Sequence, residues 1–182
     1  KQSDNFYAEM VFKSLGAGPN GEPASFDRAA AVVTDWIRAA GAADAGLRIT
    51  NGSGLFDANR ASADTIARSL VAAARDPAIA SEFVAQLAIG GLDGTLAARF
   101  RAQRASRSVR AKTGTLNFTS ALTGIISLPS GRRMAFATVA ADLDRASVKD
   151  LAAATCAAIH AEWPGLRLTW GVSRERANPM EL

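Results

Sequence analysis

The chain has 182 residues, 48% of them hydrophobic and 21% charged, and its net charge at pH 7 is +4. This length suits one domain with a real core, and the composition excludes a disordered or low-complexity chain. No apolar run approaches the roughly 20 residues that a membrane-spanning helix needs, and no signal peptide opens the sequence.

Helical patterns fill the first part of the chain. Apolar residues at helical spacing predict one helix over residues 3–16, with Gly16 as its C-cap. A second helix is predicted over residues 25–42, with Ser25 as its N-cap. Residues 47–55 then have the pattern of a short strand that runs into a glycine turn.

A third predicted helix begins after Ser62, and a fourth, shorter one covers residues 77–91. Residues 92–103 predict a turn followed by helix. The arginine-rich stretch at 99–112 supplies most of the positive charge, and Phe100 is its one interleaved aromatic residue. We therefore expect a solvated basic face near an anionic substrate, with a nucleic-acid-binding module as the alternative.

The apolar period changes to that of β-strands in the last third of the chain. Three strands are predicted, over residues 109–116, 119–128 and 132–142. The Pro-Ser-Gly-Arg sequence between the last two strands is typical of a hairpin turn. A long helix is predicted over residues 147–163. This order of elements predicts an α+β domain in which the last helix lies on an antiparallel sheet.

We divide the chain into a helical region over about residues 1–108, strands and a final helix over about 109–165, and a weakly patterned tail at 166–182. Three strands with one covering helix make a thin sheet for a domain of this size. We therefore expect an N-terminal segment outside this sequence to supply further strands. The chain also begins at Lys1 rather than at a methionine, within a pattern already in progress.

Three short segments carry the candidate chemistry: "SDN" at Ser3–Asn5, "NGSGL" at Asn51–Leu55 and "KTGT" at Lys112–Thr115. A lysine, hydroxyl groups and a glycine on an edge strand suit acyl transfer to a substrate with a free carboxylate. Lys112 supplies a fixed positive charge, and the hydroxyl groups of the "KTGT" segment can donate to the carboxylate.

The glycine and the last threonine of the "KTGT" segment have separate predicted roles. Gly114 has no side chain, so a substrate backbone can approach the strand closely. The amide N–H of Thr115 can help to form an oxyanion hole, where the loss of one donor costs about 2.7–4 kcal/mol.

The pairing of "SDN" with "KTG" is more specific than either motif alone. Penicillin-binding proteins and class A β-lactamases combine them with a Ser-x-x-Lys motif that bears the nucleophile. In that chemistry Ser3 relays a proton toward the leaving amine, and the Asn5 amide binds the substrate's peptide carbonyl and steadies the active lysine. Lys112 faces them and keeps the hydroxyl network of Ser3 oriented.

On these motifs the chain resembles the C-terminal part of a penicillin-binding protein 4-type D-alanyl-D-alanine carboxypeptidase/endopeptidase, a class C low-molecular-mass enzyme. The blocks that carry the resemblance are "KQSDNFYAEMVFKSLG", "NGSGLFDANRAS", "GGLDGTLAARF", "VRAKTGTL" and "LTGIISLPSGRRMAFA". They follow the family's order and cover most of residues 1–140. One departure is Phe56, where many relatives carry a serine.

The resemblance implies a penicilloyl-serine transferase fold, with the active site between a helical region and an antiparallel sheet. It implies removal of the terminal D-Ala from peptidoglycan stem peptides, or cleavage of cross-links, through an acyl-enzyme. It further implies inhibition by β-lactams, action in the periplasm or outside the membrane, and chemistry without a metal or other cofactor.

The nucleophile motif Ser-x-x-Lys is absent from these 182 residues. The chain has four lysines, and none has a serine three positions before it. We therefore expect the nucleophilic serine and the base lysine on an upstream segment of a longer protein, which would be the partner of this part of the domain.

Other interpretations of these residues follow from local chemistry. Ser3 and Asn5 could simply open the first helix as capping residues. The "NGSGL" segment lacks the second glycine of a serine nucleophile elbow. His160 has no evident acidic partner for a triad, Asp93 suits a turn, and Cys156 suits a buried position. A β-lactamase of the same fold and a catalytically inactive peptidoglycan-binding homologue stay open as alternatives.

Overall fold

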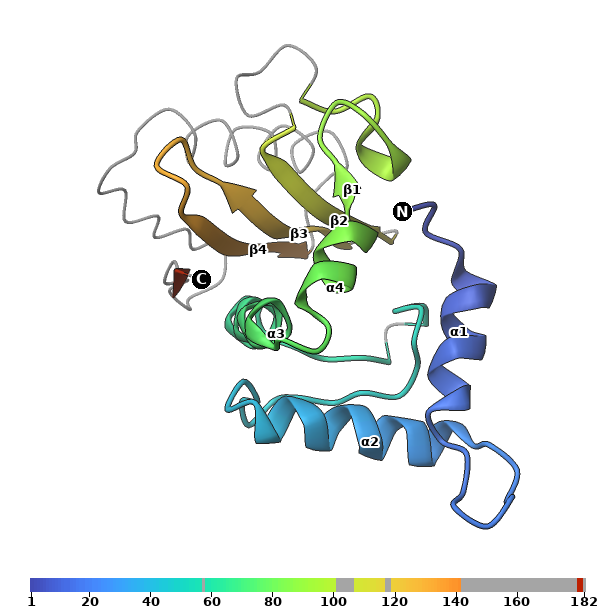
Figure 1. The fold of residues 1–182 in the computed structure, drawn as a ribbon. Helices are drawn as coiled ribbons and strands as arrows, with labels where there is room; N and C mark the ends of the chain where they lie inside the picture. Colours follow the sequence, from blue (N-terminus) through green and yellow to red (C-terminus); the bar gives the residue numbers. More distant parts are fainter. Residues whose placement is uncertain (57, 101–106, 117–118, 142–179, 182) are drawn as a thin grey trace.

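The computed structural model describes residues 1–56, 58–100, 107–116, 119–141 and 180–181 (Figure 1). The elements in chain order are α1 (Asn5–Ser14), α2 (Phe26–Ala39), α3 (Ala63–Arg75), α4 (Ala80–Gln86), β1 (Ala88–Ile89), the 3-10 helix η1 (Gly94–Leu96), β2 (Val109–Thr115), β3 (Thr119–Ser127), β4 (Arg133–Ala141) and β5 (Met180–Glu181). The four predicted helices of the first part and the three predicted strands of the last third are therefore confirmed. The short strand expected over residues 47–55 is wrong, because Arg48 forms only an isolated bridge with Arg60. The predicted helix over residues 147–163 lies outside the described residues.

The strands form an antiparallel sheet in the order β1-β2-β3-β4-β5. Strands β2, β3 and β4 are paired along most of their lengths, and a tight turn joins β3 to β4, where Leu128 N–H donates to Arg132 O at 2.8 Å. Gly131 has φ +83° in this turn, a conformation that favours glycine. The hairpin predicted between these two strands is therefore confirmed.

Strand β1 was not expected, because residues 77–91 were predicted to be helical throughout. The helix ends at Gln86, and Ala88 and Ile89 instead pair with Ala111 and Arg110 of β2. Pairing with a distant strand overrides the local helical pattern at these two residues. A second correction concerns residues 92–103, where the described residues contain the short helix η1 in place of a longer one.

One face of the sheet carries the larger core. Neighbouring strands contribute Val109, Ile126 and Met134, which lie side by side in the register. The buried residues of this core are Ala88, Leu96, Phe100, Val109, Ala111, Leu122, Ile126, Leu128, Met134 and Phe136. This core fixes β1, η1 and the first half of β2 relative to one another.

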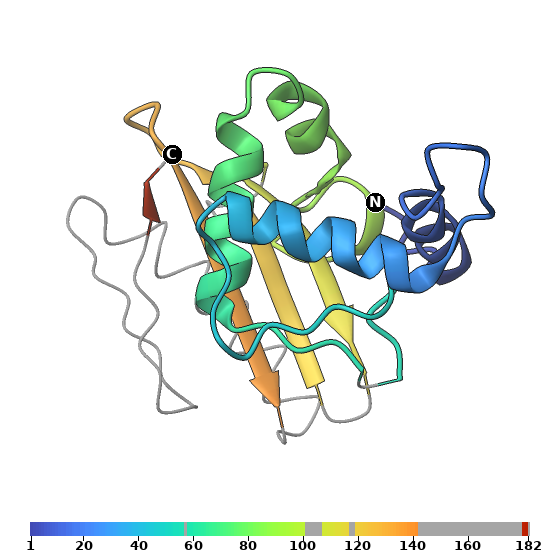
Figure 2. The ribbon, with the colours of Figure 1, turned by 90° about the horizontal axis from the view of Figure 1, so that it is seen from below.

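Helix α3 lies against β3 and β4 on the other side of the sheet (Figure 2). Ile125 and Ala135 are paired in the register and are buried on that side. The buried residues of this helix include Ala67 and Leu70. The sheet is thus enclosed on both faces in its central part.

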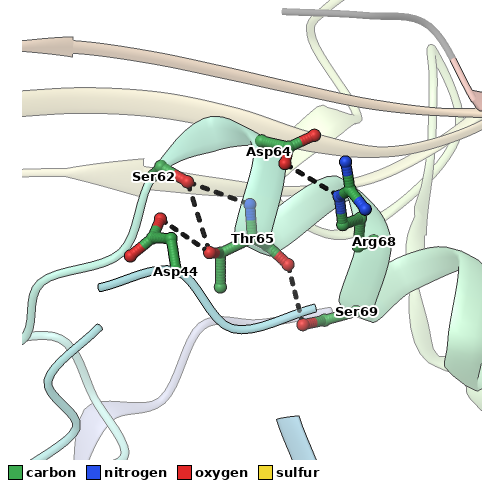
Figure 3. Close-up of polar contacts among 6 residues, drawn as sticks. All are labelled: Asp44, Ser62, Asp64, Thr65, Arg68 and Ser69. Carbon is green, nitrogen blue, oxygen red and sulfur yellow. Dashed lines mark hydrogen bonds and ion pairs between the residues drawn. The ribbon is translucent and has the colours of Figure 1, made fainter. Parts of the chain in front are cut away.

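A polar network anchors the first turn of α3 (Figure 3). The Ser62 hydroxyl accepts a hydrogen bond from Thr65 N–H at 3.0 Å, as an N-cap residue does. Thr65 is 2% exposed, and its hydroxyl donates to Asp44 at 2.8 Å. Hydrogen bonds from Ser62 and Thr65 hold the pKa of Asp44 below its usual value. The network ties the segment after α2 to α3 without leaving the buried hydroxyl unsatisfied.

The caps of the first two helices agree only partly with the sequence analysis. Ser25 caps α2 as predicted and accepts from Arg28 N–H at 3.3 Å. Helix α1 ends at Ser14 with Leu15 as its C-cap, so the prediction of Gly16 was wrong. Gly16 instead lies against the backbone of Ser25, where a Cβ would meet the Ser25 carbonyl oxygen at 2.0 Å. None of the helices in the described residues has the length and the apolar character that spanning a bilayer requires.

Candidate active site

Lys112 lies in the middle of β2, where the strand changes from buried to exposed. Val109 and Ala111 are fully buried, whereas Gly114 and Thr115 are exposed. Among the described residues, β1 pairs with β2 only at Arg110 and Ala111. The second half of β2 therefore has β3 on one side and an open edge on the other.

The direction of the peptide groups along this edge follows from the hydrogen bonds at the ends of β2. Gly90 N–H donates to Val109 O on the β1 side, and Leu116 N–H donates to Thr119 O on the β3 side. Peptide groups of successive residues in an antiparallel strand point to alternate sides. The N–H and C=O groups of Thr113 and Thr115 accordingly point toward the open edge.

The Lys112 side chain reaches two oxygen atoms at this edge. Its Nζ donates to Thr113 O at 2.5 Å and to Ser3 Oγ at 2.7 Å. Ser3 is 109 positions away in the sequence. The structure therefore brings the serine of "SDN" and the lysine of "KTG" into direct contact.

Burial lowers the pKa of Lys112 below that of an ordinary lysine. Because burial disfavours the charged ammonium group, this position is not the one that stability alone would select for a lysine. Groups whose pKa is perturbed in this way gather at functional sites.

Ser3 precedes helix α1 in a left-handed backbone conformation, with φ 60°. The residue that caps the helix is Asp4, whose carboxylate accepts from Tyr7 N–H at 2.8 Å. Capping of α1 therefore does not use the Ser3 hydroxyl, which is bonded to Lys112 instead. Asn5 is exposed and is the first residue of the helix.

The "NGSGL" segment is hydrogen-bonded to helix α1 through Glu9 and so holds the helix in place. The Glu9 carboxylate accepts hydrogen bonds from Gly52 N–H at 3.2 Å, from Ser53 N–H at 3.1 Å and from the Ser53 hydroxyl. The Ser53 hydroxyl is the main cause of a lowered pKa at Glu9. Gly52 lies so close to α1 that a Cβ would be 2.5 Å from the Cβ of Phe12. The segment therefore positions the helix that follows Ser3, in agreement with its rejection as a nucleophile elbow.

Asp93 and the beginning of η1 form a tight turn that contacts both the N-terminal segment and β2. The Asp93 carboxylate accepts from Ile89 N–H at 2.6 Å and from Lys1 Nζ at 2.7 Å, and both contacts lower its pKa. Thr95 N–H donates to Lys1 O at 3.1 Å. The Thr113 hydroxyl donates to the Thr95 hydroxyl at 2.9 Å. The prediction that Asp93 lies in a turn is confirmed.

Gly114 is not required by the packing of the sheet. Among the described residues, a Cβ at this position would meet only the Cβ of Ala121, at 3.4 Å, which is an ordinary contact. Its φ lies outside the left-handed region. The absence of a side chain at Gly114 therefore leaves space next to the strand, and the backbone conformation does not require a glycine.

The comparisons with known proteins agree with these motifs. The model of the D-Ala-D-Ala carboxypeptidase 3 (S13) family matches residues 1–161, and the chain belongs to this family. It is 37% identical over 144 residues to carboxypeptidase DacB of Mycolicibacterium smegmatis, covering 76% of this chain and 31% of the relative. It is also 37% identical over 144 residues to a D-alanyl-D-alanine carboxypeptidase of Actinomadura sp. (strain R39), covering 76% of this chain and 26% of that protein.

The fold is similar to that of penicillin-binding protein 4 (dacB) from Haemophilus influenzae. The TM-score is 0.71 at 25% identity, and the match covers 79% of this chain and 32% of that chain. The predicted α+β, penicilloyl-serine transferase fold is thereby confirmed. The chain spans about a third or less of the length of the relatives it matches.

Two residues around the site were not identified from the sequence. Thr95 and Glu9 lie in blocks that carry the family resemblance, but neither was given a role at the site, and both contact the segments that carry the motifs. The glycine-containing turn at 93–95 was a local signal for Thr95, but only the three-dimensional structure shows what lies beside it. The predicted positions of His160 and Cys156 lie outside the described residues.

Proposed function

We propose that this chain is part of a serine-type D-Ala-D-Ala carboxypeptidase/endopeptidase that acts on peptidoglycan stem peptides through an acyl-enzyme. The observation that carries this proposal is the 2.7 Å contact between Lys112 Nζ and Ser3 Oγ. The two motifs that this chemistry requires meet at an open strand edge. Family membership and the similarity to a penicillin-binding protein support the same activity.

The open edge of β2 suits the binding of an extended peptide that ends in a carboxylate. The Thr113 and Thr115 side chains supply hydroxyl donors, and Lys112 supplies a positive charge. Gly114 leaves room for the substrate backbone. The Thr115 N–H, which points toward the edge, donates to the oxyanion that forms when the scissile carbonyl is attacked.

The covalent steps divide between this chain and the nucleophile, which we place on a segment outside these 182 residues. The nucleophilic serine oxygen adds to the carbonyl carbon of the penultimate D-Ala, and its proton passes to the base lysine of Ser-x-x-Lys. The C–N bond breaks as the terminal D-Ala amine receives a proton through the Ser3 hydroxyl. Water then hydrolyses the ester and regenerates the serine.

Lys112 holds the Ser3 hydroxyl in place for this proton transfer, because its ammonium group donates to Ser3 Oγ. The Asn5 amide, at the start of α1, binds the substrate's peptide carbonyl and steadies the base lysine. We place the reaction outside the cytoplasmic membrane, in the periplasm or an equivalent compartment. β-Lactams acylate the same serine and act as inhibitors.

The test uses the longer protein that contains this chain together with its Ser-x-x-Lys segment. Lys112→Ala should reduce the rate of acylation by a fluorescent penicillin about 100-fold or more, as the loss of one electrostatic stabiliser does elsewhere. The control is Lys13→Ala, on the helix end remote from Ser3. An unchanged acylation rate in Lys112→Ala would contradict the assigned role.

The wild-type labelling pattern separates the alternatives. Stable labelling with slow release supports the peptidase, and release of D-Ala from a stem peptide identifies its reaction. Rapid turnover of the penicillin would instead indicate a β-lactamase. No labelling would indicate a peptidoglycan-binding homologue, or a nucleic-acid-binding module if DNA is bound in a salt-dependent way.

A further inference from the structure

The turn formed by Asp93, Gly94 and Thr95 lies between the two motifs and contacts both. On one side, Thr95 N–H and the Asp93 carboxylate bind Lys1, two residues before Ser3. On the other side, the Thr95 hydroxyl is paired with that of Thr113. One turn therefore connects the segment that presents Ser3 with the strand that presents the carboxylate-binding residues.

We propose that Thr95 is a positioning residue for recognition of the substrate's terminal carboxylate, and that it acts by orienting the hydroxyl group of Thr113. The inference rests on the proposed function, because it assumes that Thr113 binds that carboxylate. It assigns to Thr95 a part in substrate specificity that the motifs themselves do not contain.

The chemistry of the hydroxyl pair supports this role. A threonine hydroxyl has one proton to donate and two lone pairs that accept. Thr113 donates to Thr95 at 2.9 Å in the structure, and donation to a carboxylate would need that same proton. Thr95 can then reverse the bond and donate its own proton to Thr113. The pair keeps its hydrogen bond in both arrangements, and the Thr113 oxygen stays in one place.

The turn keeps its shape without the Thr95 hydroxyl. Gly94 has φ +52°, and a Cβ there would be 2.6 Å from Lys1 O, so the backbone of the turn is packed directly on the N-terminal segment. Leu96, the next residue after Thr95, is fully buried in the core. The contacts with Lys1 use the Thr95 backbone and the Asp93 side chain. Removal of the hydroxyl should therefore affect Thr113 and leave the turn intact.

The experiment compares Thr95→Val, which keeps the shape and removes the hydroxyl, with Thr95→Ser, which keeps the hydroxyl. Both are made in the longer protein and assayed for hydrolysis of a peptide ending in D-Ala-D-Ala. We expect Thr95→Val to raise KM about 3- to 10-fold, as the loss of one neutral hydrogen bond does, with kcat within about 2-fold of wild type. Thr95→Ser should stay within about 2-fold in both constants. Thr34→Val, on α2, is the matched control and should match wild type.

A double-mutant cycle with Thr113→Val shows whether Thr95 acts through Thr113. We expect Thr95→Val to change KM less than about 2-fold once the Thr113 hydroxyl is absent. Equal effects in both backgrounds, a normal KM in Thr95→Val, or a defect in Thr95→Ser as large as in Thr95→Val would each overturn the inference. If Thr95→Val does not fold, Thr95→Ala replaces it in the same cycle.

Failure of this inference is distinguishable from failure of the proposed function. A wild-type protein that is neither labelled by fluorescent penicillin nor active on the peptide contradicts the proposed function. A wild-type protein that is active, with a Thr95→Val variant equal to it, contradicts the role of Thr95 alone.

Discussion

The two halves of strand β2 differ in what surrounds them. Val109 and Ala111 are fully buried, and the strand is paired on both sides at Arg110 and Ala111. From Lys112 onward no described residue forms strand pairs with one edge of β2, and the side chains are polar or absent. The first half contributes to stability through burial, and the second holds groups that packing does not require. The rigid, buried half of the strand therefore fixes the position of the proposed site residues that directly follow it.

Two glycines on paired strands show the same difference. Gly124 of β3 is paired with Ala111, and a Cβ at Gly124 would be 2.2 Å from Arg110 O. Gly114 of β2 is paired with Ala121, and a Cβ there would make an ordinary contact at 3.4 Å. The first glycine is required by the fold, and the second is available for a ligand.

The largest effect is expected from Gly124→Ala, which tests the buried half. The added methyl group would clash with backbone, which cannot move as a flexible side chain can, so we expect a loss of about 3 kcal/mol or more in the free energy of unfolding. Urea denaturation followed by circular dichroism measures this. A loss below about 1 kcal/mol would show that β2 and β3 move apart easily to accommodate the methyl group. The buried half of β2 would then be less tightly packed than the 2.2 Å distance at Gly124 indicates.

A smaller and different effect is expected from Gly114→Ala. The free energy of unfolding should stay within about 0.5 kcal/mol of wild type, because the methyl group is accommodated. The acylation rate with fluorescent penicillin should fall about 10-fold, since the methyl group occupies the space that a substrate backbone needs. Unchanged acylation together with unchanged stability would remove the argument that this glycine serves a ligand.

The smallest effect is expected from Glu9→Gln, which tests how firmly α1 holds Ser3 against the open half of β2. The folded-state pKa of Glu9 is lowered by its hydrogen bonds, so its contribution to stability is present above the unfolded value of 4.5 and is lost as the pH falls through the folded value. Because the Glu9 side chain is only partly buried, we expect a difference of about 1 kcal/mol or less at pH 7, shrinking below pH 4.5.

Thermal unfolding of wild type and Glu9→Gln at pH 7 and below pH 4 measures this difference. The control is Glu82→Gln on α4, where the glutamate is exposed. This replacement should change the thermal stability by the same small amount at pH 7 and below pH 4. A Glu9→Gln difference that grows toward acidic pH would have the wrong sign and would contradict the anchoring role of Glu9.

The sequence predicts well those features that are decided within a few residues. The caps at Ser25 and Ser62 and the turn at Gly131 depend on side-chain and backbone chemistry of the immediate neighbours, and each is found where expected. Strand β1 is missed because its two residues become a strand only by pairing with β2.

The candidate site was predictable only in part for the same physical reason. Its motif residues Ser3 and Lys112 have recognisable neighbours in the sequence, whereas Glu9 and Thr95 gain their positions from contacts between distant segments. The apolar pattern of α1 likewise predicts a helix, but it does not predict which of the apolar side chains are buried. Phe6 and Tyr7 are 74% and 69% exposed, while Phe12 is buried.

The contact between Ser3 and Lys112 joins residues 109 positions apart. Forming such a contact requires closure of a long loop of chain, which has an entropic cost. A nascent chain therefore carries the serine of this pair for more than a hundred residues of synthesis before the lysine exists. The pair can therefore form only after β2 has been synthesised and has come to lie beside the segment that precedes α1.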